Sequence, residues 1–417
     1  MLKNKKTVES RRNFLKASAA GAAGIMIAGA HKKASAQSGS PWPATGYMQI
    51  NPNIDNCRVV YITDTSMLKR TTYNNFSDAN TNAIDQAKVK ANMDKMACAL
   101  ARRTLPDDAW RLIFRKPTAK SWAQVKVTMK LNCCGTFNPC IGAVAKLCEV
   151  LNGIGVPYGN ITLFDGGAAS GNGCPDKYTP FKTGGQLPPV NIIARGDAYA
   201  ITVAGWNTTC ATVVRDADIF ITVAVDKGHD RLNQFSGVTM SLKNHVGTIN
   251  FSHPGDDPGV YMLCNYHKHE ALLGWPTADV PAKQQLAFVD SLFAGKPGDW
   301  TGGVNDGAVL HTLVMGTLAG PVDYYTAKKI RTRIYTDFNV TRVNEFVEGF
   351  GYSAAERTAL DTMDPNTDPA GRGLVDAANV AYATSRGQVD AKIGDYKAGS
   401  ATQADVLSTI KKYRNAI

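Results

Sequence analysis

Short apolar runs recur along the middle of the chain and alternate with segments that have the spacing of amphipathic helices. The runs have the length and composition of buried strands, and they lie at residues 58–63, 125–131, 161–164, 190–194, 219–225, 286–290 and 312–315. Residues 82–103 and 142–152 carry apolar positions at helical spacing. Buried strands that alternate with helices predict an α/β fold with a mostly parallel sheet flanked by helices.

The pattern changes from about Ala327, where helical segments of mixed charge follow one another. These segments lie at residues 327–335, 340–350, 353–362, 373–385 and 403–414. We expect residues 327–417 to form a helical C-terminal region, either packed on the core or folded as a small subdomain. Residues 53–326 then form the α/β core domain. A Ser-, Gly- and Pro-rich lead-in at 37–52 precedes this core.

The first 36 residues have the features of a twin-arginine signal peptide in their usual order. Arg11 and Arg12 precede an apolar pair and a lysine, and a weakly apolar run and a small-x-small cleavage pattern ending at Ala36 follow. We therefore expect a protein that engages the twin-arginine translocase, is cut near Ala36 and is periplasmic or otherwise exported. No cysteine stands at the cleavage position, so a lipoprotein anchor is not expected.

Removal of the signal peptide lowers the net charge of the chain. The whole chain carries +11, but residues after 36 hold 38 basic and 34 acidic residues, a net charge of +4. That balance, with no basic stripe interleaved with aromatics, does not indicate a nucleic-acid partner. Beyond the signal, no apolar run approaches the roughly 20 residues of a membrane-spanning helix. We therefore expect no permanent membrane span.

All nine cysteines follow the signal, and none forms a Cys-x-x-Cys pair. The spacing of a ferredoxin cluster or a zinc ribbon is therefore missing. We expect mostly buried small apolar side chains, with one or two disulfides formed after export. The alternative is a metal or redox role for the group formed by Cys133, Cys134 and Cys140.

Polar side chains stand at the ends of several predicted strands. Lys130 and Asn132 close the run at 125–131, Asp165 follows the run at 161–164, and Asp290 ends the run at 286–290. Ligands of parallel sheets bind beyond the carboxyl ends of the strands. We therefore expect these residues, together with Asn244, to bind a small-molecule anion.

The densest group of chemically active residues follows the run at 219–225. Lys227 and His229 come directly after it, and Lys243 and His245 follow within 20 positions. Lysines stabilise negative charge, and a histidine beside them transfers protons at neutral pH. These four residues are the predicted catalytic group.

Three further histidines, His253, His267 and His269, are weak candidates for metal ligands because two of them form a His-x-His pair. The alternative is a polar loop over the site. The sequence identifies no cofactor. It contains no Gly-x-Ser-x-Gly nucleophile elbow, no Walker A loop and no His-Glu-x-x-His helix.

Taken in order, these motifs resemble the domain of unknown function 362 family over roughly residues 55–330. The resemblance begins at 109–114 and at a strand ending in Lys-x-Asn, here Lys130 to Asn132. It continues through residues 143–151 and 160–165. It is most specific at residues 217–219, 227–230 and 237–247, and the last of these ranges contains Leu-Lys-Asn at 242–244. It ends near residues 288–298 and 320–323. The resemblance implies the fold and the location of the site but no reaction, because the family has no settled activity.

Two departures weaken what the resemblance implies. The family's late motif begins with Asp and carries a second Asp, whereas this chain has Gly320 and Tyr325 at those positions. The iron–sulfur cysteines of some relatives are also missing. The hypotheses are an exported enzyme acting on a small anionic or hydroxylated substrate, a periplasmic carrier of a metal, cluster or anion, and an accessory subunit of an exported redox complex. A fold-level analogy with nickel-cofactor racemases is a weaker alternative.

Overall fold

The computed structural model describes residues 40–136, 138–166, 173–230, 232–249, 260–298, 307–361 and 388–414. Arg11, Arg12 and the rest of the predicted signal lie outside the described residues, as do His253 and the helix predicted at 373–385. Within the described ranges, no helix is both long enough and apolar enough to cross a membrane.

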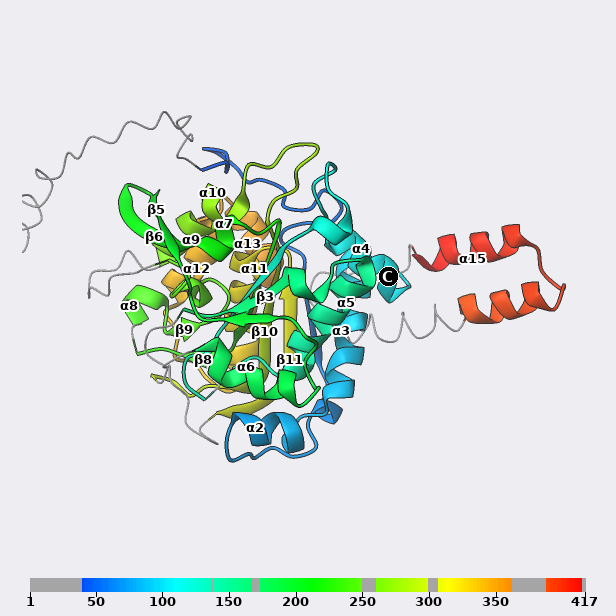
Figure 1. Ribbon diagram of the computed structural model, residues 1–417, viewed down its shortest axis with the longest axis horizontal. Helices are drawn as coiled ribbons and strands as arrows, with labels where there is room; N and C mark the ends of the chain where they lie inside the picture. Colours follow the sequence, from blue (N-terminus) through cyan, green and yellow to red (C-terminus); the bar gives the residue numbers. More distant parts are fainter. Residues whose placement is uncertain are drawn as a thin grey trace, which may run out of the picture. The chain divides into compact units, whose positions relative to one another are not determined.

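A seven-stranded sheet forms the centre of the protein (Figure 1), in the order β1-β11-β10-β7-β2-β3-β4. The strands are β1 Val59–Thr63, β2 Val127–Leu131, β3 Ile161–Phe164, β4 Asn191–Ile193, β7 Ile219–Val225, β10 Gln284–Ala294 and β11 Ala308–Gly316. The five neighbouring strands from β10 to β4 pair in parallel, whereas β11 pairs antiparallel with both β10 and β1. The predicted α/β fold with a mostly parallel sheet is confirmed, and each predicted strand is present.

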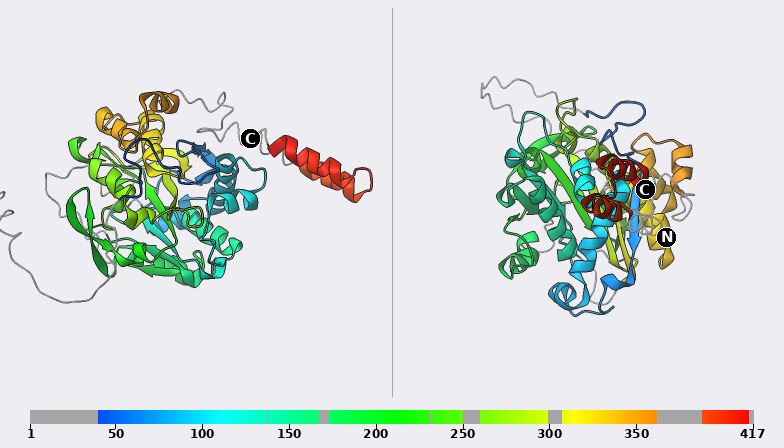
Figure 2. Two further views of the ribbon diagram at one scale, coloured as in Figure 1. Left: turned by 90° about the horizontal axis from the view of Figure 1, so that it is seen from above. Right: turned by 90° about the vertical axis from the view of Figure 1, so that its right-hand side faces the viewer.

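Alternate residues of the strands point to opposite faces of the sheet, and both faces are buried. In β1, Val60 and Ile62 join one apolar cluster while Val59 and Tyr61 join another. The first cluster packs under α3 Gln86–Ala101, α4 Pro106–Ile113, α5 Ile141–Ile154 and α6 Cys174–Thr183. The second packs under α9 Val260–His267, α11 Ala319–Tyr325, α12 Val340–Glu348 and α13 Ala354–Asp361. Figure 2 shows these two layers, blue to green and yellow to orange, on either side of the sheet.

Local chemistry explains where the long helices begin and end. Asp85 caps α3 by accepting a hydrogen bond from the Lys88 N–H, and the helix stops at Arg102, whose φ of 49° is left-handed. Pro106 occupies the first turn of α4 with two aspartates behind it, which suits the positive end of a helix. The helices predicted at 82–103 and 142–152 are confirmed as α3 and α5.

Several elements were not predicted. β5 Ala198–Val203 and β6 Trp206–Ala211 form a separate antiparallel hairpin, and β8 Lys227–Gly228 pairs with β9 Val238–Thr239 as a short ribbon. Short helices complete the described core: α2 Phe76–Asp78, α7 Thr212–Arg215, α8 Leu232–Phe235 and α10 Glu270–Leu273. The ribbon matters most here, because it carries Lys227.

The C-terminal region is helical where it is described. The segment predicted as one helix at 327–335 is instead a π-helical turn, Thr326–Ile330, followed by a 3-10 turn, Arg331–Arg333. The helices predicted at 340–350, 353–362 and 403–414 appear as α12, α13 and α15 Gln403–Arg414. Side chains from Ala327 to Leu360 belong to the same apolar cluster as β1, β10 and β11, so this stretch packs directly on the sheet.

All nine cysteines are free thiols in the structure, and eight of them are buried. The one or two disulfides expected after export are therefore not formed in it. Burial raises the pKa of Cys148 and Cys264, which keeps these thiols protonated. They act as small apolar side chains of the core, as expected.

Candidate functional site

The candidate site lies where the strand order of the sheet reverses. From β2 the chain builds β3 and β4 outward on one side, and it then returns to place β7 against the opposite edge of β2. In open α/β sheets, ligands bind beyond the carboxyl ends of the strands at such a reversal point. Here those ends are Leu131 and Val225, so the residues that follow them, Asn132 to Cys134 and Asp226 to His229, border the site.

A buried ion pair forms the floor of the site. Lys130 Nζ lies 2.6 Å from Asp165 Oδ1, and the two side chains are only 1% and 3% exposed. The ammonium also donates to the Leu131 carbonyl at 2.8 Å, and Asp165 Oδ2 accepts the Cys133 N–H at 2.6 Å. The ends of β2 and β3 are thereby joined, and the Lys130 charge is neutralised by Asp165.

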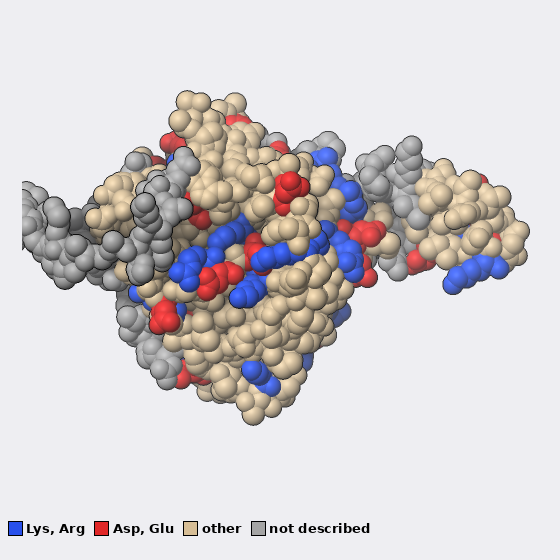
Figure 3. Space-filling view, turned by 45° about the horizontal axis from the view of Figure 1, so that its top comes forward, with Lys and Arg blue, Asp and Glu red and all other residues tan. Residues whose placement is uncertain are grey.

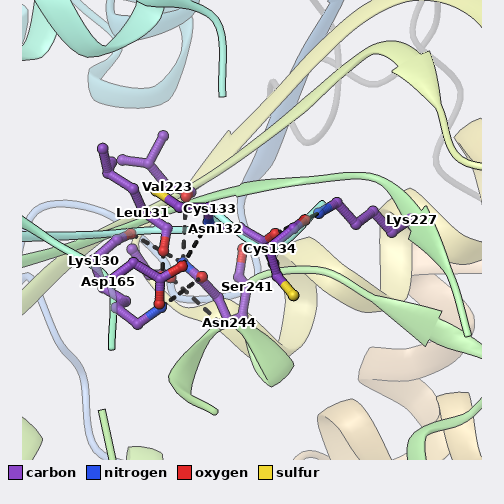
Figure 4. Close-up of polar contacts among 11 residues, drawn as sticks. Lys130, Leu131, Asn132, Cys133, Cys134, Asp165, Val223, Lys227, Ser241 and Asn244 are labelled. Carbon is purple, nitrogen blue, oxygen red and sulfur yellow. Dashed lines mark hydrogen bonds and ion pairs between the residues drawn. The ribbon is translucent and has the colours of Figure 1, made fainter. Parts of the chain in front are cut away.

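Asn244 ties the predicted Leu-Lys-Asn motif to this floor. Its amide nitrogen donates to the Lys130 carbonyl at 2.9 Å and to Thr222 Oγ1 at 3.0 Å, while its amide oxygen lies 3.3 Å from Lys130 Nζ. Figure 4 shows Lys130, Asp165 and Asn244 converging on one point. Asn244 is therefore a structural bridge between the motif loop, β2 and β7.

Lys227 supplies a second buried ammonium with different surroundings. Its Nζ donates to Asn132 Oδ1 at 2.8 Å and to the backbone carbonyl of Cys134, and the residue is 1% exposed. Figure 4 shows this side chain reaching toward Asn132 and Cys134. Among the described residues, no carboxylate forms an ion pair with Lys227. Burial lowers the pKa of Lys227 to about 8, because the charged form loses its hydration without gaining a counterion.

The β8–β9 ribbon fixes the backbone of Lys227 and of His229, which directly follows β8. Lys227 is paired with Thr239 across the ribbon, and the His229 N–H donates to the Gly237 carbonyl at 2.6 Å. Gly228 passes so close to the Lys296 carbonyl that a Cβ at this position would collide with it. The ribbon is thus pressed onto the loop after β10.

His229 and Lys243 both contact the aromatic ring of Phe235. His229 Nδ1 lies 2.9 Å from Asp230 Oδ1, and its ring packs edge-on against Phe235 with 4.8 Å between centroids. The ammonium of Lys243 lies 4.5 Å from the centroid of the same Phe235 ring. This is the geometry of a cation–π contact. His229 is 6% exposed and Lys243 is half-buried, so both border the site from the ribbon side.

Two buried carboxylates, those of Asp323 and Asp226, hold the loops that border the site in place. Neither residue was predicted as a site residue from the sequence. Asp323 accepts the N–H groups of Ser241 and Leu242 at 2.8 and 2.7 Å, and burial raises its pKa to about 7. Asp226 pairs with Arg331 at 2.9 Å, and both side chains are 0% exposed. The resemblance reached the motif at 320–323 but gave Asp323 no role. Arg331 carries no local signal, because its partner lies more than 100 positions away.

Asp290 is buried at the end of the neighbouring strand, where it serves the backbone. Its two oxygens accept the N–H groups of Cys140 and Leu292 at 2.9 and 3.0 Å. A cavity of about 20 Å³ beside it is lined in part by Asn138, whose buried Oδ1 has no hydrogen-bond partner in the described part of the chain. This volume fits one water molecule. The predicted role of Asp290 in binding substrate stays a prediction.

His245 lies away from the strand ends. Its ring packs against Phe220, Tyr266 and His267, with centroids 5.3, 5.3 and 4.4 Å away. Phe220 is the second residue of β7, about 16 Å along the strand from Val225. Among the described residues, neither ring nitrogen of His245 has a hydrogen-bond partner, and burial lowers the pKa of His245. The structure therefore does not bring His245 to Lys227, and its catalytic role stays a prediction.

The two candidate metal ligands that the structure describes, His267 and His269, each make a different hydrogen bond within the protein. His267 Nδ1 lies 2.9 Å from Gln284 Oε1 inside the core, and His269 Nδ1 accepts the Ala271 N–H at the start of α10. Within the described part of the chain, no group of three or more His, Cys, Asp or Glu side chains is placed to hold a metal ion. His253 lies outside that part.

The surface charges do not single out the site. On the face drawn in Figure 3, basic and acidic side chains lie interspersed. Ion pairs at the surface include Lys120 with Asp218 at 2.6 Å and Lys146 with Asp94 at 2.7 Å. Pairs that solvent reaches typically contribute about 1 kcal/mol or less each. The charge that distinguishes the site is therefore the buried one on Lys227.

Comparison with known proteins identifies the N-terminal segment. Residues 10–28 match the family of TAT (twin-arginine translocation) pathway signal sequences, the segment that contains Arg11 and Arg12. None of the curated proteins matches the chain. The chain thus carries a signal for export across a membrane through the twin-arginine translocase.

Proposed function

We propose that this protein is a periplasmic enzyme that binds a small anionic substrate at the carboxyl ends of β2 and β7. The observation that carries the proposal is the Lys227 ammonium, buried at the reversal point of the sheet without a carboxylate partner among the described residues. A buried charge is costly unless it is paired. A bound anion supplies the missing partner.

A comparison of Lys227 with the second buried lysine, Lys130, supports the proposal. Lys130 lies in the same network but is neutralised by Asp165 at 2.6 Å, so it shapes the site without adding net charge. Lys227 adds its charge beside neutral oxygen acceptors, those of Asn132 and Cys134. The predicted roles divide accordingly: Lys130, Asp165 and Asn244 form the scaffold, and Lys227 binds the anion.

Turnover requires a group that moves a proton, and His229 is the candidate because it directly follows the β8 strand that carries Lys227. Its Nδ1 is 2.9 Å from Asp230 Oδ1, a contact that orients the ring, and histidine is the side chain that exchanges protons near neutral pH. Lys243 stands on the other side of Phe235 and adds positive potential. The proposed chemistry is acid–base catalysis on a carboxylate- or phosphate-bearing metabolite.

The resemblance to the domain of unknown function 362 family agrees with this location. Its most specific motifs fall on the Lys227 ribbon and on the loop of Lys243 and Asn244. We further propose removal of the signal near Ala36 and residence in the periplasm, where folded substrates of the twin-arginine route are released.

The proposal is tested with protein exported by its own signal. Binding of phosphate and of small carboxylates is measured by calorimetry for the wild type, Lys227→Met and Lys227→Arg, with folding checked by circular dichroism. We expect binding that is lost in Lys227→Met and kept in Lys227→Arg. Equal binding by Lys227→Met rejects the site. Anion binding without turnover of any bound metabolite identifies a carrier instead of an enzyme.

A further inference from the structure

The hydroxyl of Thr239 is buried without a hydrogen-bond partner. Thr239 is the second residue of β9 and is 5% exposed, and its Oγ1 makes no hydrogen bond within the described part of the chain. A buried hydroxyl in this condition lowers the stability of a protein, and native structures rarely keep one without a reason. A ligand oxygen that accepts a hydrogen bond from Thr239 would remove the cost.

Thr239 and Lys227 lie on the same face of the β8–β9 ribbon. They are directly opposite each other in its antiparallel register, and side chains of directly opposite residues share a face, with their Cβ atoms about 5 Å apart. An ammonium group has three N–H donors, and Lys227 gives two of them to Asn132 Oδ1 and the Cys134 carbonyl. Among the described residues, a third donor of Lys227 and the hydroxyl of Thr239 remain for a ligand.

The charges around this face add up to more than one positive charge. Burial raises the pKa of the Cys134 thiol, and the charged groups that act on this thiol are Lys227, Asp165, Lys243 and Lys130. Three ammonium groups and one carboxylate amount to a net charge of +2. A dianion matches that charge, whereas a monoanion leaves half of it unbalanced. Cys134 is partly accessible, so solvent reaches the residue that Lys227 contacts.

We infer that the site binds the phosphoryl group of a phosphomonoester, with Lys227 and Lys243 balancing its charge and Thr239 donating a hydrogen bond to one of its oxygens. This inference rests on the proposed anion site at Lys227 and names the class of its ligand. A phosphomonoester carries about 1.5 to 2 negative charges at pH 7 and three terminal acceptor oxygens. A carboxylate carries one charge and two oxygens. With two oxygens paired to the lysines, only the phosphoryl group keeps an acceptor for Thr239.

The test compares three small anions that differ in shape and charge: methyl phosphate, methyl sulfate and acetate. Methyl sulfate has the tetrahedral shape of methyl phosphate but a single charge, and acetate is planar. Calorimetry at pH 7 with the exported protein measures their affinities, because Lys227, with a pKa of about 8, is mostly protonated there. Methyl phosphate should bind on the order of tenfold more tightly than either monoanion. Affinity for methyl sulfate or acetate equal to that for methyl phosphate overturns the inference.

Variants of Thr239 test the hydrogen bond. Thr239→Val keeps the shape of the side chain and removes the hydroxyl, so it should weaken methyl phosphate binding on the order of tenfold and acetate binding less than about twofold. Thr239→Ser should keep most of the affinity. In urea unfolding without ligand, Thr239→Val should be at least as stable as the wild type. Unchanged affinity for methyl phosphate in Thr239→Val overturns the inference.

Thr317→Val is the matched control. Thr317 is 0% exposed, and its hydroxyl also has no hydrogen-bond partner among the described residues. It directly follows β11, whose last residue, Gly316, pairs with Ala287 near the start of β10, so it lies away from the carboxyl ends of the parallel strands. Thr317→Val should bind methyl phosphate as the wild type does. An equal loss of affinity in Thr317→Val and Thr239→Val shows that the loss is not local and contradicts the role of Thr239.

The two proposals fail separately. If the three anions bind with equal affinity and all binding is lost in Lys227→Met, the phosphoryl group is rejected and the anion site stands. If Lys227→Met binds methyl phosphate as tightly as the wild type, both proposals are rejected.

Discussion

Arg331 and Asp226 form an ion pair with both side chains 0% exposed and 2.9 Å between Nη1 and Oδ1. Asp226 directly precedes Lys227, and Arg331 also donates to the Gly295 carbonyl at 3.0 Å and pairs with Asp337 at 2.8 Å. One guanidinium from the C-terminal part of the chain thus holds the end of β7, the loop after β10 and its own following segment. The direction of Lys227 depends on it.

Arg331→Met should destabilise the protein strongly, because it leaves the buried Asp226 carboxylate without its partner. Breaking a buried pair by removing one member costs about 3–5 kcal/mol. Denaturant unfolding followed by circular dichroism measures the change. The double variant Arg331→Met/Asp226→Asn removes the stranded charge and should recover part of the loss. A loss below 1 kcal/mol in the single variant contradicts this role for the pair.

Anion affinity should fall as the pH rises through about 8. Only the protonated form of Lys227 attracts an anion, and burial places its pKa at about 8. Calorimetry from pH 6.5 to 9.5 with phosphate as the probe measures the decline. Lys227→Arg stays protonated over this range and should bind with little dependence on pH. A wild-type profile as flat as that of Lys227→Arg would show that Lys227 is not the titrating group.

The same residue should affect stability with a defined sign. Its folded-state pKa is lowered from 10.5 to about 8, so the unfolded chain binds more protons between these values and stability rises with pH across that window. Below pH 8 the buried charge therefore costs about 3 kcal/mol. Lys227→Met should be more stable than the wild type at pH 7, and this advantage should shrink toward pH 10 in urea unfolding.

His245→Phe should stabilise the protein. The wild-type ring buries two nitrogens without hydrogen-bond partners among Phe220, Tyr266 and His267. Removing two unsatisfied polar atoms should gain about 1–3 kcal/mol at pH 7. The gain should grow below pH 6.5, because a histidine with a lowered folded-state pKa loses stability as the pH falls. Thermal unfolding at pH 5 and pH 7 measures both effects. A lower melting temperature for His245→Phe at both pH values contradicts the prediction.

Gly228→Ala should disturb the ribbon that aims Lys227. A Cβ at this position collides with the Lys296 carbonyl, whereas a Cβ at Gly153 in α5 meets nothing within 4 Å. We expect Gly228→Ala to lose anion binding and Gly153→Ala to keep it, with a small gain in helix stability of about 0.5–1 kcal/mol. Calorimetry and urea unfolding of the pair distinguish the two outcomes. Unchanged binding in Gly228→Ala shows that the ribbon tolerates the displacement.

The strands that match the sequence prediction most closely are those whose side chains are buried on both faces. Continuous apolar runs such as Ile161–Phe164 and Ile219–Val225 match β3 and β7 residue for residue. The β5–β6 hairpin was missed although the sequence of Ala198–Val203 is largely apolar, and its residues are mostly exposed or half-buried in the structure. The antiparallel placement of β1 and β11 depends on pairing across the whole chain, which local patterns do not encode.

Some residues of the candidate site could be predicted from the sequence, and others could not. Lys130, Asn132, Asp165 and Lys227 stand at strand ends, and parallel strands bring their ends together, so the sequence pattern predicted a group that the structure assembles. Sequence proximity grouped His245 with Lys227, although the loop between them carries its ring back along β7 to Phe220. Arg331 could not be found from sequence, because its role arises only when the last helices pack on the sheet.

The position of Arg331 in the chain also sets an order of events. A ribosome makes the export signal first and the partner of Asp226 after nearly 300 further residues, so the signal is available while the end of β7 still lacks its counterion. The Lys227 ribbon therefore cannot reach its final form on a growing chain until residues beyond 331 have left the ribosome. A route that accepts finished proteins suits such a molecule, because a pathway that threads each segment as it emerges would separate Asp226 from Arg331 by a membrane.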